Sequence, residues 1–101
     1  MSEQQLAPSW DGSVVLDIGG DVGALMLRTS PTMIGCEIDL TPDDANLPHT
    51  HSAVRERHSH TGVTFAAVYP HLKSGTYTIE GSAQRITIVG GRVADVEYEV
   101  S

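Results

Sequence analysis

Short apolar stretches alternate with polar residues along this chain, and clusters of Gly, Pro, Asp and Asn separate them. Alternation with a period of two indicates strands, because successive side chains of a strand point to opposite faces of the sheet. The stretches recur about every 8–12 residues, which is typical of a sandwich or barrel. This pattern predicts eight strands, at residues 13–18, 22–28, 35–41, 49–58, 63–69, 76–80, 85–89 and 92–100.

One of these stretches leaves an alternative open. Leu and Met also favour helices, so a short helix competes with the strand at residues 22–28. The sequences Gly19-Gly20-Asp21 and Gly90-Gly91 predict tight turns, since glycine adopts positive φ without steric cost. We predict an all-β fold, an antiparallel two-sheet sandwich of about seven or eight strands. Residues 1–9 are expected to be a flexible arm and residues 10–101 a single sandwich domain.

Composition narrows the classes of partner. The 101 residues carry a formal net charge of −7, with a single lysine. An acidic surface repels phosphate backbones and anionic lipid, so we expect neither nucleic acid nor a membrane as partner. The N-terminal residues lack the basic start and apolar run of a signal peptide, which makes a cytoplasmic location the expectation. The one cysteine, Cys36, has no partner for an internal disulfide, and we expect it to be buried in a strand.

The C-terminal half, from Val63 to Val100, contains a set of residues and stretches with a recognisable spacing: Phe65, Leu72, Gly75, Tyr77, Ile86–Val89, Gly90-Gly91 and Val93–Val100. In this set the chain resembles the prealbumin-like and carboxypeptidase-regulatory-like domains. The resemblance implies a prealbumin- or immunoglobulin-like sandwich and carries almost no information on function.

A second set of stretches extends over nearly the whole chain: Val15–Leu25, His51–Arg57, Ala66–Tyr69, Gly75-Thr76-Tyr77 and Gly90–Val96. In these stretches the chain is similar to a family of small uncharacterised bacterial proteins, some of which are labelled as phospholipases. The label implies hydrolase activity. The chain has no G-x-S-x-G elbow and no motif typical of a catalytic serine and its histidine base, so no catalytic residue is assigned.

Histidines are the most concentrated chemical feature. All five lie between positions 49 and 71: His49, His51, His58, His60 and His71. Neutral imidazole is a common ligand of zinc, copper and nickel. Residues i and i+2 of a strand share a face, so each H-x-H pair has a usable chelating geometry.

Hairpin pairing then predicts which histidines meet. With a turn centred near Thr61, opposing residues have numbers that sum to about 122, which places His51 beside His71 and Val54 opposite Val68. We therefore predict a metal site at His49, His51 and His71 for zinc, copper or nickel, with Asp43 or Asp44 as a possible oxygen ligand. His58 and His60 form a second and weaker candidate at the other end of the hairpin, roughly 25 Å away.

The run Arg55-Glu56-Arg57 on the same hairpin has two interpretations. It could form cross-strand ion pairs on the wet face, which contribute little individually. It could instead contact an anion or a partner protein, with Arg55 and Arg57 on one face.

These observations lead to one expected function and two alternatives. We expect a small soluble non-enzymatic binding module that holds a divalent transition metal through the hairpin histidines. The first alternative is a protein-interaction or homodimerisation domain without a ligand, because sheet edges pair readily. The second is a small metal-dependent hydrolase, as the family resemblance implies, whose histidines would activate a water molecule.

Overall fold

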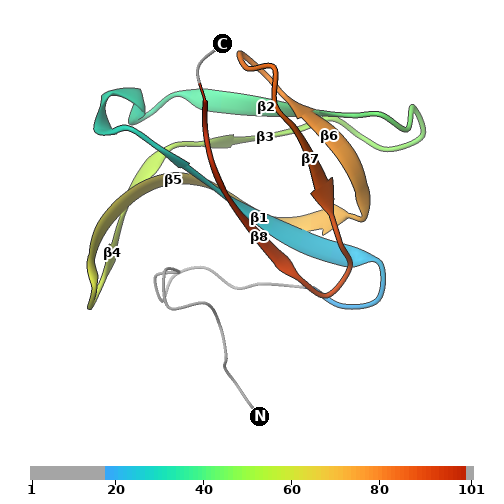
Figure 1. Ribbon diagram of the computed structural model, residues 1–101, viewed down its shortest axis with the longest axis horizontal. Coiled ribbons are helices and arrows are strands. Elements are labelled where there is room, and N and C mark those ends of the chain that lie inside the picture. The colour runs from blue at the N-terminus through green and yellow to red at the C-terminus, as the bar shows by residue number, and fades with distance from the viewer. Residues whose placement is uncertain (1–17, 100–101) are drawn as a thin grey trace.

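The computed structural model describes residues 18–99, and the predicted arm at 1–9 and nearly all of the predicted strand at 13–18 lie outside them. The described part consists of strands and one short 3-10 helix (Figure 1). These elements are β1 (Val22–Thr29), η1 (Pro31–Met33), β2 (Glu37–Pro42), β3 (Thr50–Ala53), β4 (Arg55–Ser59), β5 (Gly62–Lys73), β6 (Gly75–Ile79), β7 (Arg85–Ile88) and β8 (Val93–Glu97). None of the helical structure within 18–99 is long and apolar enough to span a membrane.

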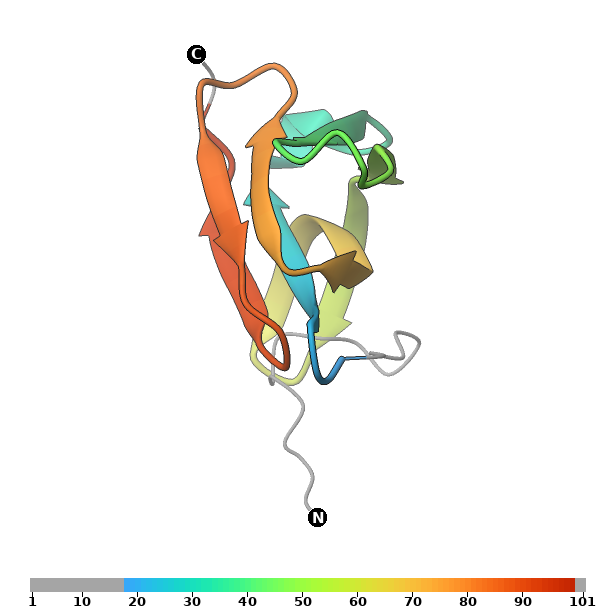
Figure 2. The ribbon, with the colours of Figure 1, turned by 90° about the vertical axis from the view of Figure 1, so that its right-hand side faces the viewer.

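Two four-stranded sheets pack against each other, with strand orders β4-β5-β1-β8 and β3-β2-β6-β7 (Figures 1 and 2). The predicted all-β sandwich is therefore confirmed, and so is the strand rather than the helix at 22–28. Antiparallel pairing dominates, but β1 and β8 run parallel, with Ala24 opposite Val93 and Arg28 opposite Glu97. Strands β5 and β8 flank β1 on its two sides.

The core follows the alternation of the strands. In β2 and β7 every second side chain is buried, as the sequence pattern predicts. The main cluster takes residues from both sheets: Leu25, Leu27, Ile38, Leu40, Val54, Ala67, Tyr69, Leu72, Tyr77, Ile79, Ile86 and Ile88. A second cluster of Met26, Ala66 and Val68 uses the opposite phase of β1 and β5, so the middle of this sheet is buried on both faces.

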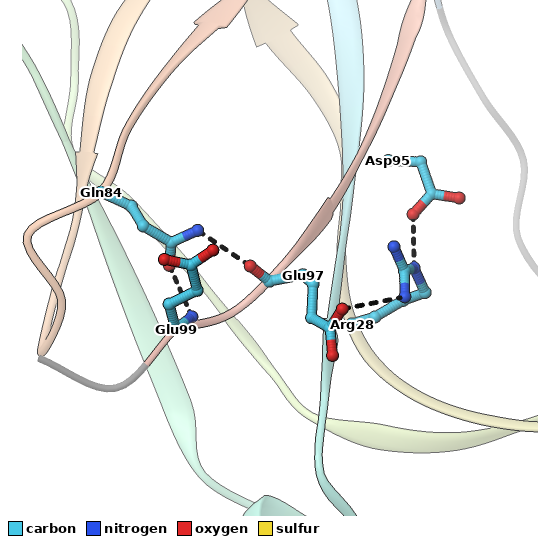
Figure 3. A network of polar contacts seen from close by, with 5 residues as sticks. All are labelled: Arg28, Gln84, Asp95, Glu97 and Glu99. Carbon is cyan, nitrogen blue, oxygen red and sulfur yellow. Dashed lines mark hydrogen bonds and ion pairs between the residues drawn. The ribbon is translucent and has the colours of Figure 1, made fainter.

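Side-chain hydrogen bonds join the sheets at several points, among them the bond from Ser52 on β3 to the carbonyl oxygen of Val68 on β5 at 2.7 Å. The hydroxyl of Tyr69 on β5 donates a hydrogen bond of 2.5 Å to the carbonyl oxygen of Ile38 on β2. At the opposite edge, the side-chain amide of Gln84 donates to the carbonyl of Glu97 at 2.8 Å and accepts from the backbone N–H of Glu99 at 2.7 Å (Figure 3). Strands β7 and β8 lie in different sheets and do not pair with each other, and the Gln84 side chain links this edge of the two sheets instead.

The predicted single strand at 49–58 is wrong, because the chain changes sheets at Val54. Residues up to Ala53 pair with β2, and the Val54 backbone bonds to Gly35 and Cys36, just before β2, at 2.8 Å each. The next residue begins β4, which pairs with β5 in the other sheet. Val54 is the only large apolar residue between His49 and His58, and it is buried in the core. Because the segment is anchored at this one point, the residues before Val54 can lie at the edge of one sheet and those after it at the edge of the other.

The expectation for Cys36 is also wrong. The residue is exposed and lies in the connection between η1 and β2 rather than in a strand. Strand β2 begins one residue later, where Glu37 opposes Ala53. The buried side chains of β2 are Ile38, Leu40 and Pro42. The alternation would also bury residue 36, but this residue lies before the start of the strand.

Candidate functional site

The observed hairpin register differs from the predicted one by a single residue. His58 opposes Val63 and Arg55 opposes Ala66, so opposing numbers sum to 121. A shift of one residue reverses which face every side chain takes. The β4–β5 pairing also ends at Arg55, and for this reason Val54 and His51 have no counterpart on β5.

His51 belongs to β3, in the other sheet from His71 on β5. Its strand partner is Asp39 on β2. The ring Nε2 lies 3.9 Å from Oε1 of Glu37, and the two side chains are 63% and 64% exposed. His51 therefore belongs to a solvated group of β2 and β3 side chains.

His49 and His71 line one pocket of about 420 Å³ at the end of β5. This volume lies in the range of small-molecule sites, roughly 300–1,000 Å³. The described residues around the pocket are Asn46, Leu47, Pro48, His49, Thr50, His71, Leu72, Lys73 and Tyr77. Two of the three histidines predicted to form a site thus line the same pocket, although not through the hairpin pairing proposed for them.

A β-bulge explains why His71 faces the pocket. Between Gly23 and Leu25 the β1–β5 register shifts, so that Ala24 opposes both Pro70 and His71. Strict alternation from Ala67 and Tyr69 would aim residue 71 into the core. The extra residue places Leu72 in the core instead and leaves His71 exposed. Pro70 is compatible with this position because a bulge relieves it of a ladder hydrogen bond.

The loop after β2 positions His49. Its turn is closed by hydrogen bonds from the N–H of Asn46 to the Asp44 carboxylate and from the N–H of Leu47 to the Asp44 carbonyl. Leu47 packs against the main core, and Pro48 restricts the backbone before His49. Thr50 then pairs with Leu40, so the imidazole stands between an anchored loop and a paired strand.

The pocket has an uneven distribution of charge. None of its described lining residues is an Asp or Glu, whereas the cationic residue Lys73 is among them. That ammonium lies 3.2 Å from the carboxylate of Asp21, which is not among the lining residues. Burial raises the pKa of Tyr77, whose hydroxyl donates to the Lys73 carbonyl at 2.8 Å and stays protonated at neutral pH.

The candidate oxygen ligands are engaged elsewhere. Asp43 forms an ion pair with Arg85, and Asp44 caps its own loop. Within residues 18–99 no group of three or more His, Cys, Asp or Glu side chains is arranged to hold a metal ion. The chain therefore brings two imidazoles, not three, to the pocket. A tetrahedral ion held by two imidazoles keeps two positions for water or an added ligand.

The second histidine pair lies at the tip of the β4–β5 hairpin. His58 Nε2 is 3.1 Å from Oε2 of Glu56, and His60 follows in the turn. The neighbouring arginines differ in burial, since Arg55 is exposed and Arg57 is 9% exposed. The predicted partner contact through Arg55, Glu56 and Arg57 stays a prediction.

Lys73, Asn46 and Tyr77 are pocket residues that sequence reasoning missed. Asn46 lies on a different segment from Lys73 and Tyr77, so no spacing in the sequence groups the three. One available signal was Pro70 inside a strand-like run, which indicates a bulge and hence a change in the direction of His71.

Comparison with family models, curated proteins and solved structures finds no match for this chain. The family resemblance, and the hydrolase activity it implies, stay predictions.

Proposed function

We propose that this protein is a non-enzymatic binding domain that holds a divalent transition metal ion between His49 and His71. The observation that carries the proposal is that a bulge and an anchored loop bring these two imidazoles to one pocket. Two nitrogen donors without a carboxylate suit zinc, copper or nickel better than the harder magnesium and calcium ions.

The proposal changes the ligand set inferred from the hairpin. His51 leaves the set because its ring lies beside Glu37 and it does not line the pocket. The ion then depends on two protein ligands, and we expect weaker binding than at a closed four-ligand structural site. The open positions are available to solvent or to a small molecule.

Calorimetric titration of the untagged protein with Zn²⁺ and Ni²⁺ tests the proposal. His49→Ala and His71→Ala should each weaken binding by roughly tenfold or more, because each removes half of the protein donors. His51→Ala is the matched control and should bind like the unmodified chain, as should His58→Ala. At a free metal concentration of 100 times Kd, binding should stabilise the fold by about 2.7 kcal/mol.

Two results would refute the proposal. One is an equal loss of affinity in His51→Ala and His49→Ala, which would mean that the ion sits elsewhere or at scattered surface histidines. The other is unchanged binding in the double variant His49→Ala/His71→Ala.

A further inference from the structure

The pocket is much larger than a metal ion needs. Its volume of about 420 Å³ equals that of roughly 14 water molecules at about 30 Å³ each. An ion held at His49 and His71 would occupy a small part of this space. The remainder suits an organic molecule, and its chemistry can be read from the other side chains around it.

Part of the pocket lining is apolar, and we call this part the apolar wall. It consists of Leu47, Leu72 and Tyr77. Leu72 and Tyr77 are 4% and 2% exposed and belong to the main core, so they are held rigidly by packing. Such a surface binds a flat or branched apolar group at little entropic cost to the protein.

The polar side of the pocket favours a negative charge. Lys73 is the only lysine of a chain with a net charge of −7, and it stands at this pocket. Asn46 adds an amide that can donate hydrogen bonds. The lining residues within 18–99 include no carboxylate that would repel an anion.

Asp21 opposes this preference from just outside the pocket. Its carboxylate is 3.2 Å from the Lys73 ammonium, with side chains 65% and 50% exposed. An anion in the pocket would therefore share the ammonium with Asp21. Lys73 should therefore raise the affinity for an anionic ligand and Asp21 should lower it. Substituting each residue in turn should change that affinity in opposite directions.

We propose that the pocket binds a small organic carboxylate with an apolar body. The body lies against Leu47, Leu72 and Tyr77, and the carboxylate is held by Lys73 and by an open position on the metal ion. The metal contact rests on the function proposed above, whereas the contacts with the apolar wall and Lys73 do not depend on it.

NMR titration of the full untagged chain with benzoate tests the inference, with and without one equivalent of Zn²⁺. Benzyl alcohol is the uncharged probe of similar shape, and inorganic phosphate is the anion without an apolar body. We expect benzoate to shift the signals of Leu47, Leu72 and Tyr77, to bind more tightly than either control, and to bind more tightly with zinc than without.

Two exposed substitutions give opposite expected signs. Lys73→Gln should weaken benzoate binding by roughly two- to fivefold, because it removes the cation. Asp21→Asn should strengthen binding by a similar factor, because it removes the competing carboxylate. A merely structural role of this ion pair would make both variants change in the same direction.

The inference is overturned if benzoate binds no better than benzyl alcohol or phosphate, or if the two variants shift affinity in the same direction. It is also overturned if zinc binds at His49 and His71 but leaves benzoate affinity unchanged, and the proposed metal function then stands. Failure of the metal function is seen separately, as an absence of zinc-induced changes in the His49 and His71 ring signals before benzoate is added.

Discussion

The replacement Tyr69→Phe tests how the two sheets are held together. The side chain is 2% exposed, and its hydroxyl donates the 2.5 Å hydrogen bond from β5 to the carbonyl oxygen of Ile38 on β2. Phenylalanine keeps the ring and its packing and removes only this donor. The net loss of one such bond is about 0.5–1.5 kcal/mol, and an unpaired buried carbonyl raises the cost. We therefore expect the free energy of unfolding to fall by about 1–2 kcal/mol, with Tm lower by roughly 4–16 °C.

The Tyr69 hydroxyl also makes the free energy of unfolding depend on pH in the alkaline range. Burial, and secondarily the charge of Asp39, raises the pKa of Tyr69 far above its ordinary value. A folded-state pKa above the unfolded one contributes stability that is present below the unfolded pKa, about 10 for tyrosine, and is lost as pH rises beyond it. The unmodified protein should accordingly lose stability from about pH 10 upward. The difference from Tyr69→Phe should shrink over the same interval.

Urea unfolding followed by fluorescence and circular dichroism between pH 7 and 11 measures both effects. Tyr98→Phe is the control, since the Tyr98 hydroxyl makes an exposed 3.2 Å bond to the Glu80 carbonyl. We expect this variant to lose less than about 0.5 kcal/mol. If Tyr69→Phe and Tyr98→Phe lose the same small amount at pH 7, the bond from Tyr69 to Ile38 does not stabilise the fold by the expected amount.

Three further substitutions address packing, backbone approach and surface charge. Leu40→Ala, at a fully buried position, should cost about 2–5 kcal/mol in urea unfolding; a loss below about 1 kcal/mol would contradict the assigned core. Gly90→Ala would place a Cβ 2.8 Å from the Asp21 Cα, so the turn before β8 must shift; a Tm equal to that of the unmodified chain would show that the turn yields freely. The Arg28–Asp95 pair, at 2.6 Å with side chains 39% and 48% exposed (Figure 3), should contribute less than about 1 kcal/mol. Asp95→Asn should therefore unfold nearly like the unmodified protein, and the small difference should vanish at high salt.

The histidine cluster shows where sequence reasoning reached its limit. The density of histidines between 49 and 71 indicated the correct region, and two of the three proposed ligands line one pocket. The reasoning failed on register, because it assumed one continuous strand through Val54 and a β5 strand that ended before Pro70. The sheet change at Val54 removed His51 from the group, and the bulge at Pro70–His71 turned His71 toward the loop.

The class of fold was determined by the sequence itself. Period-two alternation, frequent β-branched residues and regularly spaced turns are local properties, and each strand's buried face follows from the pleat. The pocket depended on the tertiary structure. Asn46, His49, His71 and Lys73 come from two separate segments, and they meet only after a strand has changed sheets and another has gained an extra residue. Such shifts of one residue cost little locally but decide which side chains face each other, so packing of the whole domain selects them.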